Sequence, residues 1–216
     1  MATPIITTQG VQPAPSSTPV NTSAVNPSPT NPSPTNMDEG IRYSFFLNDG
    51  TKGAGDYPKL YATLIASAQT KIVVWDGYIH QPDMELIKNI SHPVSLILLT
   101  SCSSQNWSQK RDALLNELKQ QVPVGLKPDV SVQIGYIDRS VHGQDKWNCH
   151  DRFLIIDDTE YYLIGSSMAH HRELHSSTGI LHIEHSDDKD VIQKAFDKVY
   201  DEAMTKGWIS SYQNLN

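Results

Sequence analysis

Two rhythms of apolar residues alternate along this chain. In the first, apolar residues recur every three or four positions, a spacing that lines one face of a helix. It predicts helices over 57–69, 83–90 and 107–122, and a closing helix after Asp187 and Asp188, two residues suited to the start of a helix. The second rhythm is a short run of β-branched and other apolar residues, which predicts a strand.

Strand-like runs separate the predicted helices. The first three lie over 71–76, 94–100 and 130–136. Their alternation with helices is typical of a parallel sheet with helices packed on its faces. The rhythm then changes, because 152–157 and 161–166 are close enough to form a hairpin and 179–184 predicts one more strand. We therefore expect an α/β fold with a mixed, mainly parallel sheet flanked by helices.

The first 36 residues follow neither rhythm. They contain no charged side chain and eight of the thirteen prolines, and the pentapeptide of residues 26–30 repeats as residues 31–35. Such a composition offers little to bury in a core. We expect 1–36 to be a disordered leader or linker rich in Pro, Ser, Thr and Asn, and 37–216 to be the folded domain.

The expected domain is acidic, because all 17 basic and 24 acidic residues lie in 37–216 and give a net charge of −7. This balance argues against a broad basic surface for nucleic acid or anionic membrane, but it is compatible with a local basic pocket. No apolar stretch is long enough for a transmembrane helix, and the N-terminus lacks the pattern of a signal peptide. We expect a cytoplasmic protein.

Cysteine and histidine are the residues that would indicate a metal site. The two cysteines, Cys102 and Cys149, show no spacing typical of a disulfide framework or of thiolate ligands. Five histidines between 170 and 185 suggest zinc, but the alternation over 181–184 is that of an ordinary strand with a polar face. We expect neither a metal nor another cofactor. The clustered histidines are His170, His171, His175, His182 and His185.

Candidate chemistry begins at the predicted strand over 152–157. If the extended chain starts at His150, a period of two places His150 and Arg152 on one face. This pair suits a phosphate, since a guanidinium can hold the oxygens while the imidazole approaches phosphorus. The plainer alternative is a structural pair in which Asp151 or Asp157 compensates the charge of Arg152.

A second set of candidates follows the strand over 71–76. Asp76 and Tyr78 lie at its carboxyl end, where open α/β sheets usually bind their ligands. Both are therefore candidate binding residues. An equally good interpretation of Asp76 is that it caps the loop that follows the strand.

These residues carry a resemblance to a known family. His150-x-Arg152-x4-Asp157, followed by Gly165 and Ser166, resembles the His-x-Lys-x4-Asp and Gly-Ser motif of the phospholipase D superfamily. Residues 68–79 resemble its first strand, and the order of elements fits over about 41–210. The resemblance implies that His150 is a nucleophile that forms a phosphohistidine. It also implies that Arg152 and the segment Gly165, Ser166 and Ser167 bind phosphate. Asp157 completes the motif, although it could simply brace the hairpin.

The resemblance also implies an assembly and an activity. Only one motif is present, whereas the family needs a second histidine to protonate the leaving group, so a homodimer with two facing copies of His150 is expected. The expected function is that of a metal-independent phosphodiesterase, a hydrolase in which imidazole does the work of a metal-bound hydroxide. We expect it to act on nucleic acid in preference to lipid.

Departures from the motif favour an alternative function. Arg152 stands in place of the usual Lys, Met168 in place of a common Asn, and no carboxylate is found to orient His150, Thr178 being the nearest residue. The His-Asp-Arg variant also resembles a lipid-binding domain that follows a microtubule-interacting-and-trafficking module in some eukaryotic proteins. A catalytically degenerate domain that binds phosphate-bearing ligands or lipid head groups is thus the alternative. A third is an interaction module tethered by the leader.

Overall fold

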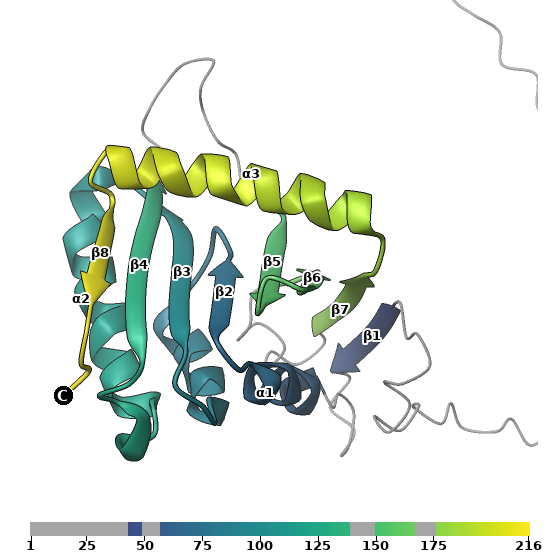
Figure 1. The fold of residues 1–216 in the computed structure, drawn as a ribbon, viewed down its shortest axis with the longest axis horizontal. Helices are drawn as coiled ribbons and strands as arrows, with labels where there is room; N and C mark the ends of the chain where they lie inside the picture. The colour runs from purple at the N-terminus through teal and green to yellow at the C-terminus, as the bar shows by residue number, and fades with distance from the viewer. Residues whose placement is uncertain (1–42, 49–56, 139–149, 167–175) are drawn as a thin grey trace, which may run out of the picture. The chain divides into compact units, whose positions relative to one another are not determined.

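The computed structural model describes residues 43–48, 57–138, 150–166 and 176–216 (Figure 1). They belong to one compact unit, Pro34–Asn216. The expected leader over 1–36 lies outside the described residues. So do Cys149, Ser167, His170, His171 and His175.

In the described part of the chain, eight strands form a single sheet in the order β1-β7-β6-β5-β2-β3-β4-β8. Only β2–β3 and β3–β4 are parallel pairs, and the other five pairs are antiparallel. The strands are β1 Tyr43–Asn48, β2 Lys71–Trp75, β3 Ser95–Cys102, β4 Ser131–Asp138, β5 Arg152–Ile156, β6 Glu160–Ile164, β7 Ser176–Ile183 and β8 Ile209–Tyr212.

The expected α/β class, a mixed sheet flanked by helices, is confirmed, but the parallel part is smaller than expected. It is confined to β2, β3 and β4, which follow one another through helical connections. From β5 to β7, strands that follow one another in the chain pair antiparallel. The two outermost strands, β1 and β8, also pair antiparallel, and the apolar pattern did not predict them.

The helical elements match four predicted helices. α1 spans Tyr57–Ser67, α2 Ser104–Gln121 and α3 Ser186–Thr205. The predicted helix over 83–90 is a 3-10 helix, η2, over Gln81–Asn89, and a further short 3-10 turn, η3, spans Val124–Leu126. Among the described helices, none is both long and apolar enough to cross a membrane.

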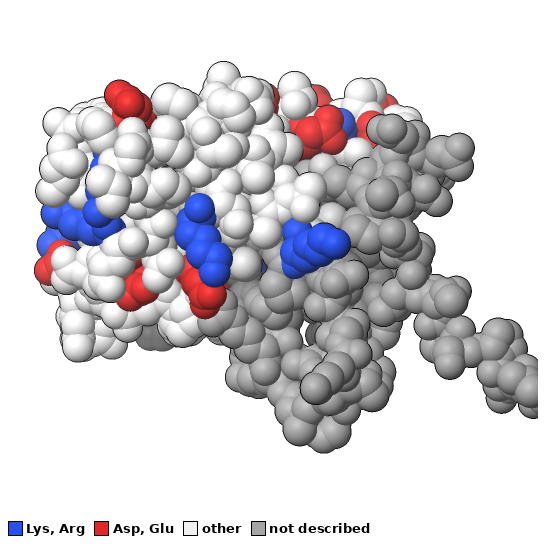
Figure 2. Space-filling model, turned by 90° about the horizontal axis from the view of Figure 1, so that it is seen from below, with Lys and Arg blue, Asp and Glu red and all other residues white. Residues whose placement is uncertain are grey.

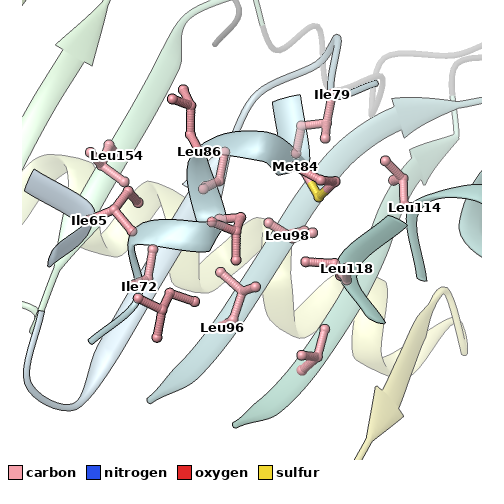
Figure 3. Close-up of a cluster of buried hydrophobic side chains, with 14 of the residues drawn as sticks. Ile65, Ile72, Ile79, Met84, Leu86, Leu96, Leu98, Leu114, Leu118 and Leu154 are labelled. Carbon is pink, nitrogen blue, oxygen red and sulfur yellow. The ribbon is translucent and has the colours of Figure 1, made fainter. Parts of the chain in front are cut away.

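The two faces of the sheet bury two separate hydrophobic clusters. On one face, alternate residues of β2 and β5 such as Ile72 and Leu154 pack against α1, η2 and α2 (Figure 3). On the other face, the intervening residues such as Val73 and Ile155 pack against α3, which runs across the strands in Figure 1. Each large apolar side chain buried in this way contributes about 1.5–3 kcal/mol. Alternating burial thus fixes the register and holds the sheet between its helices.

One edge of the sheet collects the ends of several strands. Trp75, the last residue of β2, pairs with Phe153 near the start of β5. Arg152, the first residue of β5, pairs with Ile164, the last of β6. The residues after β2, at the start of β5 and after β6 therefore converge here, and we call this edge the site edge.

Basic side chains do not form a continuous surface on the face seen from below. Lys and Arg side chains of the described residues lie there among Asp and Glu side chains and uncharged residues (Figure 2). This distribution agrees with the charge balance of the sequence.

Candidate phosphate site

Arg152 brings four predicted site residues together at the site edge. Its Nη1 donates a hydrogen bond to the carbonyl oxygen of Gly165 at 3.3 Å, and its Nε lies 3.4 Å from Oδ1 of Asp76. The guanidinium carbon lies over the ring of Tyr78, 5.2 Å from its centre. The side chain is 23% exposed, so this cation is partly buried but accessible to solvent. A charged, oriented and accessible guanidinium can bind a phosphate.

Asp76 both caps the loop after β2 and contacts a site residue, the two roles that the sequence left open. Its Oδ1 accepts a hydrogen bond from the backbone N–H of Tyr78 at 2.8 Å, which caps the turn after β2. The same oxygen faces Nε of Arg152, and the residue is only 3% exposed. A carboxylate buried this deeply needs compensation by a cation or hydrogen bonds. Asp76 therefore fixes the loop that carries Tyr78 and, with it, the position of Arg152.

Gly165 allows two backbones to approach closely. Its N–H donates to the carbonyl oxygen of Gly179 at 2.8 Å, which joins the end of β6 to β7. A Cβ at position 165 would lie 3.1 Å from the nitrogen of Gly179 and 3.4 Å from its oxygen, closer than backbone atoms readily accommodate. Glycine at 165 thus keeps the carbonyl that accepts from Arg152 in place.

Two hydroxyl groups near Gly165 are buried and have no hydrogen-bond partner among the described residues. They are Oγ of Ser166 and Oγ1 of Thr178, and Thr178 is 5% exposed. Oγ1 of Thr178 lies 3.5 Å from the position that a Cβ of residue 165 would occupy. A buried hydroxyl that lacks a partner costs roughly 1–3 kcal/mol, so both groups are suited to an added acceptor such as a phosphate oxygen. From the sequence, Thr178 is only the residue nearest to an expected carboxylate, and the motif does not predict that it binds phosphate. The pairing of β7 with β6 brings it beside Gly165.

His150 lies two residues before Arg152 and is exposed. The predicted alternation is confirmed within β5, since Leu154 and Ile156 pack on the face covered by α1 and α2, and Ile155 packs on the α3 face. The strand itself begins only at Arg152, so His150 precedes it as part of the connection. His150 is thus two residues from Arg152 along the chain, in the segment that leads into β5.

Asp157 lies at the opposite end of β5. An extended strand rises about 3.3 Å per residue, so its backbone is roughly 16 Å from that of Arg152. Its carboxylate accepts hydrogen bonds from the N–H groups of Gln69, Thr70 and Lys71 at 2.8–2.9 Å, and from the hydroxyl of Thr70. The structure therefore does not bring Asp157 together with the other candidates, and its contacts brace the turn between α1 and β2.

These contacts affect the acidity of Asp157. Burial acts to raise the pKa of this carboxyl group, but the hydrogen bonds from Gln69, Lys71 and Thr70 outweigh it and lower the pKa below its ordinary value. The ionised form is thus the one that the turn stabilises.

The two described members of the histidine cluster have local structural contacts. Nε2 of His182 lies 2.7 Å from a carboxylate oxygen of Glu160, and its ring stacks on Tyr162. Nδ1 of His185 accepts a hydrogen bond from the N–H of Asp187 at the start of α3. Within the described part of the chain, no group of three or more His, Cys, Asp or Glu side chains is arranged to hold a metal ion.

Comparison with known proteins gives structural likenesses only. No family model matches the sequence, and no curated protein matches it. Solved structures similar to this chain include Nuc from Salmonella typhimurium, a phospholipase D family member. It is 11% identical, with 80% of this chain and 99% of that chain covered and a TM-score of 0.46.

Two further solved structures are similar to this chain. NucT from Helicobacter pylori is 15% identical over 74% of this chain and 95% of its own, with a TM-score of 0.48. A phosphatidylserine synthase from Haemophilus influenzae is 11% identical over 80% of this chain and 40% of its own, with a TM-score of 0.41. Because all three TM-scores lie below 0.5, the assignment of function rests on the site residues.

Proposed function

We propose that this domain is a phosphodiesterase of the phospholipase D type, which works as a homodimer and acts on nucleic acid in preference to lipid. The observation that carries the proposal is the placement of Arg152 at the site edge. Asp76, Tyr78 and Gly165 hold its guanidinium two residues from an exposed His150. A phosphate held by Arg152 would have an imidazole beside it.

Each residue of the site has a role in this proposal. Arg152 binds nonbridging phosphate oxygens by charge-assisted hydrogen bonds. Ser166 and Thr178 donate their buried hydroxyl hydrogens to the same phosphate, and Ser167 extends this segment as the sequence motif implies. Asp76 orients the guanidinium through Nε, the carbonyl of Gly165 orients it through Nη1, and the ring of Tyr78 packs against it. Asp157 stabilises the fold and takes no part in the chemistry.

The reaction has two steps. In the first, a ring nitrogen of His150 forms a bond to phosphorus while the phosphorus–oxygen bond to the leaving group breaks, and the leaving oxygen takes a proton from a second imidazole. In the second, water loses a proton to that second imidazole and attacks phosphorus, and the bond to His150 breaks. Both imidazoles return to their starting states, so the cycle needs no metal-bound hydroxide.

The second imidazole explains the proposed dimer. One imidazole cannot be the nucleophile and the acid for the leaving group at the same moment, and the motif occurs once in this chain. A two-fold axis that passes the site edge would bring two copies of His150 to one phosphate. The site is therefore incomplete in a single copy.

A domain that binds phosphate without cleaving it is the second candidate, and two observations favour it. Arg152 is already paired with the buried carboxylate of Asp76, so part of its charge is neutralised before any ligand arrives. Thr178, a residue that cannot become an anion at neutral pH, is the residue nearest in the sequence to where the motif leads us to expect a carboxylate that orients His150.

Hydrolysis in excess EDTA separates the two functions. The wild-type protein, His150→Ala and the control His92→Ala are compared on a single-stranded oligonucleotide. His92 is also exposed but lies just before β3, at the opposite edge of the sheet. The enzyme proposal predicts equal rates for the wild type and His92→Ala and no hydrolysis by His150→Ala.

Other outcomes reject the enzyme. If the wild type, His150→Ala and His92→Ala are all inactive, and Arg152→Ala weakens phosphodiester binding more than Arg152→Lys does, the domain binds phosphate without cleaving it. Loss of wild-type activity in EDTA would contradict a cycle that runs on two imidazoles.

A further inference from the structure

A hollow of about 650 Å³ lies between η2 and α2, beyond the end of β3. Its polar lining residues include Gln81, Asn106, Gln109 and Lys110, and its apolar lining residues include Pro82 and Leu114. Its volume falls within the range of small-molecule sites, which is roughly 300–1,000 Å³. No residue of the candidate phosphate site lines it.

The loop that follows β2 connects the hollow to the phosphate site. His80 lines the hollow and Tyr78 lies under the guanidinium of Arg152. Residues two apart have Cα atoms at most about 7 Å from each other. The hollow and the phosphate site therefore adjoin along the loop after β2.

Hydrogen bonds hold this loop against the wall of the hollow. Oγ1 of Thr100, in β3, accepts from the N–H of Ile79 at 3.2 Å and from Nζ of Lys110 at 3.0 Å. Thr100 is fully buried, so its hydroxyl ties the loop to α2 from within. A ligand in the hollow would thus have a defined position relative to Arg152.

The lining matches a nucleobase better than a lipid head group. Carboxamides present a donor and an acceptor side by side, the pattern with which Asn and Gln bind the edge of a base. Pro82, an exposed residue of the lining, offers apolar surface to its flat face. The common zwitterionic lipids end in an ammonium group, which the positive charge of Lys110 would repel. No acidic side chain is among the described residues that line the hollow.

We infer that the hollow is a base subsite, which binds one unpaired nucleobase of a strand whose phosphate lies on Arg152. The inference rests on the proposed function, which it narrows to single-stranded nucleic acid. The base must be unpaired and unstacked because the hollow would receive a whole base, including the face and the Watson–Crick edge that a duplex covers.

The test compares two strands and two double variants, all in a His150→Ala background so that the strand stays intact. Fluorescence anisotropy measures the binding of a short single-stranded oligonucleotide and of an abasic strand of equal length. The first double variant is Asn106→Ala with Gln109→Ala. The control is Asn116→Ala with Gln120→Ala, which removes the same two groups from positions of α2 that do not line the hollow.

The base subsite predicts that the Asn106/Gln109 variant loses roughly tenfold in affinity for the intact strand, about the effect of two neutral hydrogen bonds. The control should bind like its parent, and both variants should bind the abasic strand equally. Equal affinity of the parent for the two strands, no binding of either strand, or equal behaviour of the two double variants would overturn the inference.

Vesicles of phosphatidylglycerol and phosphatidylcholine test the competing ligand. If the Asn106/Gln109 variant weakens vesicle binding instead, the hollow is a lipid subsite and the inference is wrong. The test is independent of catalysis: a base-dependent affinity could be measured even if the wild type proved unable to hydrolyse any phosphodiester, a result that would reject only the enzyme.

Discussion

Asp76 and Arg152 form an ion pair between β2 and β5 at the site edge, with Oδ1 3.4 Å from Nε. The carboxylate is only 4% exposed, whereas the guanidinium is 23% exposed. The pair therefore couples stability to ligand binding, because the cation that compensates a buried carboxylate is also the group proposed to hold phosphate.

Removing the cation alone should cost more than removing the pair. Arg152→Ala leaves the charge of Asp76 buried beside one fewer partner, so it should lower the free energy of unfolding by roughly 1–3 kcal/mol. In the Arg152→Ala background, Asp76→Asn should recover part of this loss because it removes the buried charge. Urea unfolding of the wild type, both single variants and the double variant measures the coupling. Strictly additive effects would show that the two side chains do not stabilise one another.

Asp157 should matter for stability and not for chemistry. Asp157→Asn removes the charge that accepts hydrogen bonds from Gln69, Thr70 and Lys71, so it should lower the free energy of unfolding by about 1.5–3 kcal/mol. Asp158→Asn is the matched control. Asp158 adjoins Asp157 and shares its positive φ, and its side chain forms a surface ion pair with Lys71, worth less than about 1 kcal/mol. Chemical denaturation gives both values, and an equal cost for the two would contradict the bracing role.

The same contacts predict a pH dependence. The pKa of Asp157 is lower in the folded protein than its ordinary value, so its contribution is fully present above about pH 4, the pKa of an unfolded Asp. The contribution is lost as the pH falls through the lowered pKa. The difference in stability between the wild type and Asp157→Asn should therefore shrink on acidification. A difference that stayed constant or grew below pH 4 would show that the carboxylate is not stabilised in its ionised form.

Gly165→Ala should damage the site, whereas Gly125→Ala should not. The new methyl group at 165 would press on the backbone of Gly179, and relieving the contact must move the carbonyl that accepts from Arg152. Overpacking of this kind costs roughly 1–3 kcal/mol, and phosphodiester binding should weaken as well. At Gly125, a methyl group would meet no atom within 4 Å beyond its chain neighbours, so binding should be unchanged. Calorimetric titration with a phosphodiester compares the two, and unchanged affinity in Gly165→Ala would place the ligand elsewhere.

Most of the central fold follows from local patterns, but its edges do not. The strands β2, β3 and β5 are dense in β-branched and apolar residues, and burial on both faces of the sheet requires such runs. In contrast, β8 contains Ser210 and Ser211 and is only partly buried, so its sequence carries little apolar signal. Pairing with β4 decides its structure.

The candidate site could be predicted only as separate pieces. The spacing of His150 and Arg152 within one segment is a local property. The contact of Arg152 with Asp76 depends on the antiparallel register that sets Trp75 opposite Phe153, far along the chain. Thr178 reaches Gly165 through the register of β6 and β7, in the same long-range way. Asp157 shows the converse, because it is close to Arg152 in sequence but lies at the other end of a strand.

The central claim is that His150 attacks phosphorus, and a trapped intermediate tests it most directly. Turnover of a single-stranded oligonucleotide in EDTA is quenched in alkali, which preserves phosphohistidine, and the peptide that contains His150 is analysed by mass spectrometry. The account predicts a nucleotidyl adduct in the wild type, in which phosphorus is bonded to His150 and still carries the retained part of the strand, and neither adduct nor hydrolysis in His150→Ala. Hydrolysis at the wild-type rate by His150→Ala, or wild-type turnover with the adduct on another residue, would contradict it.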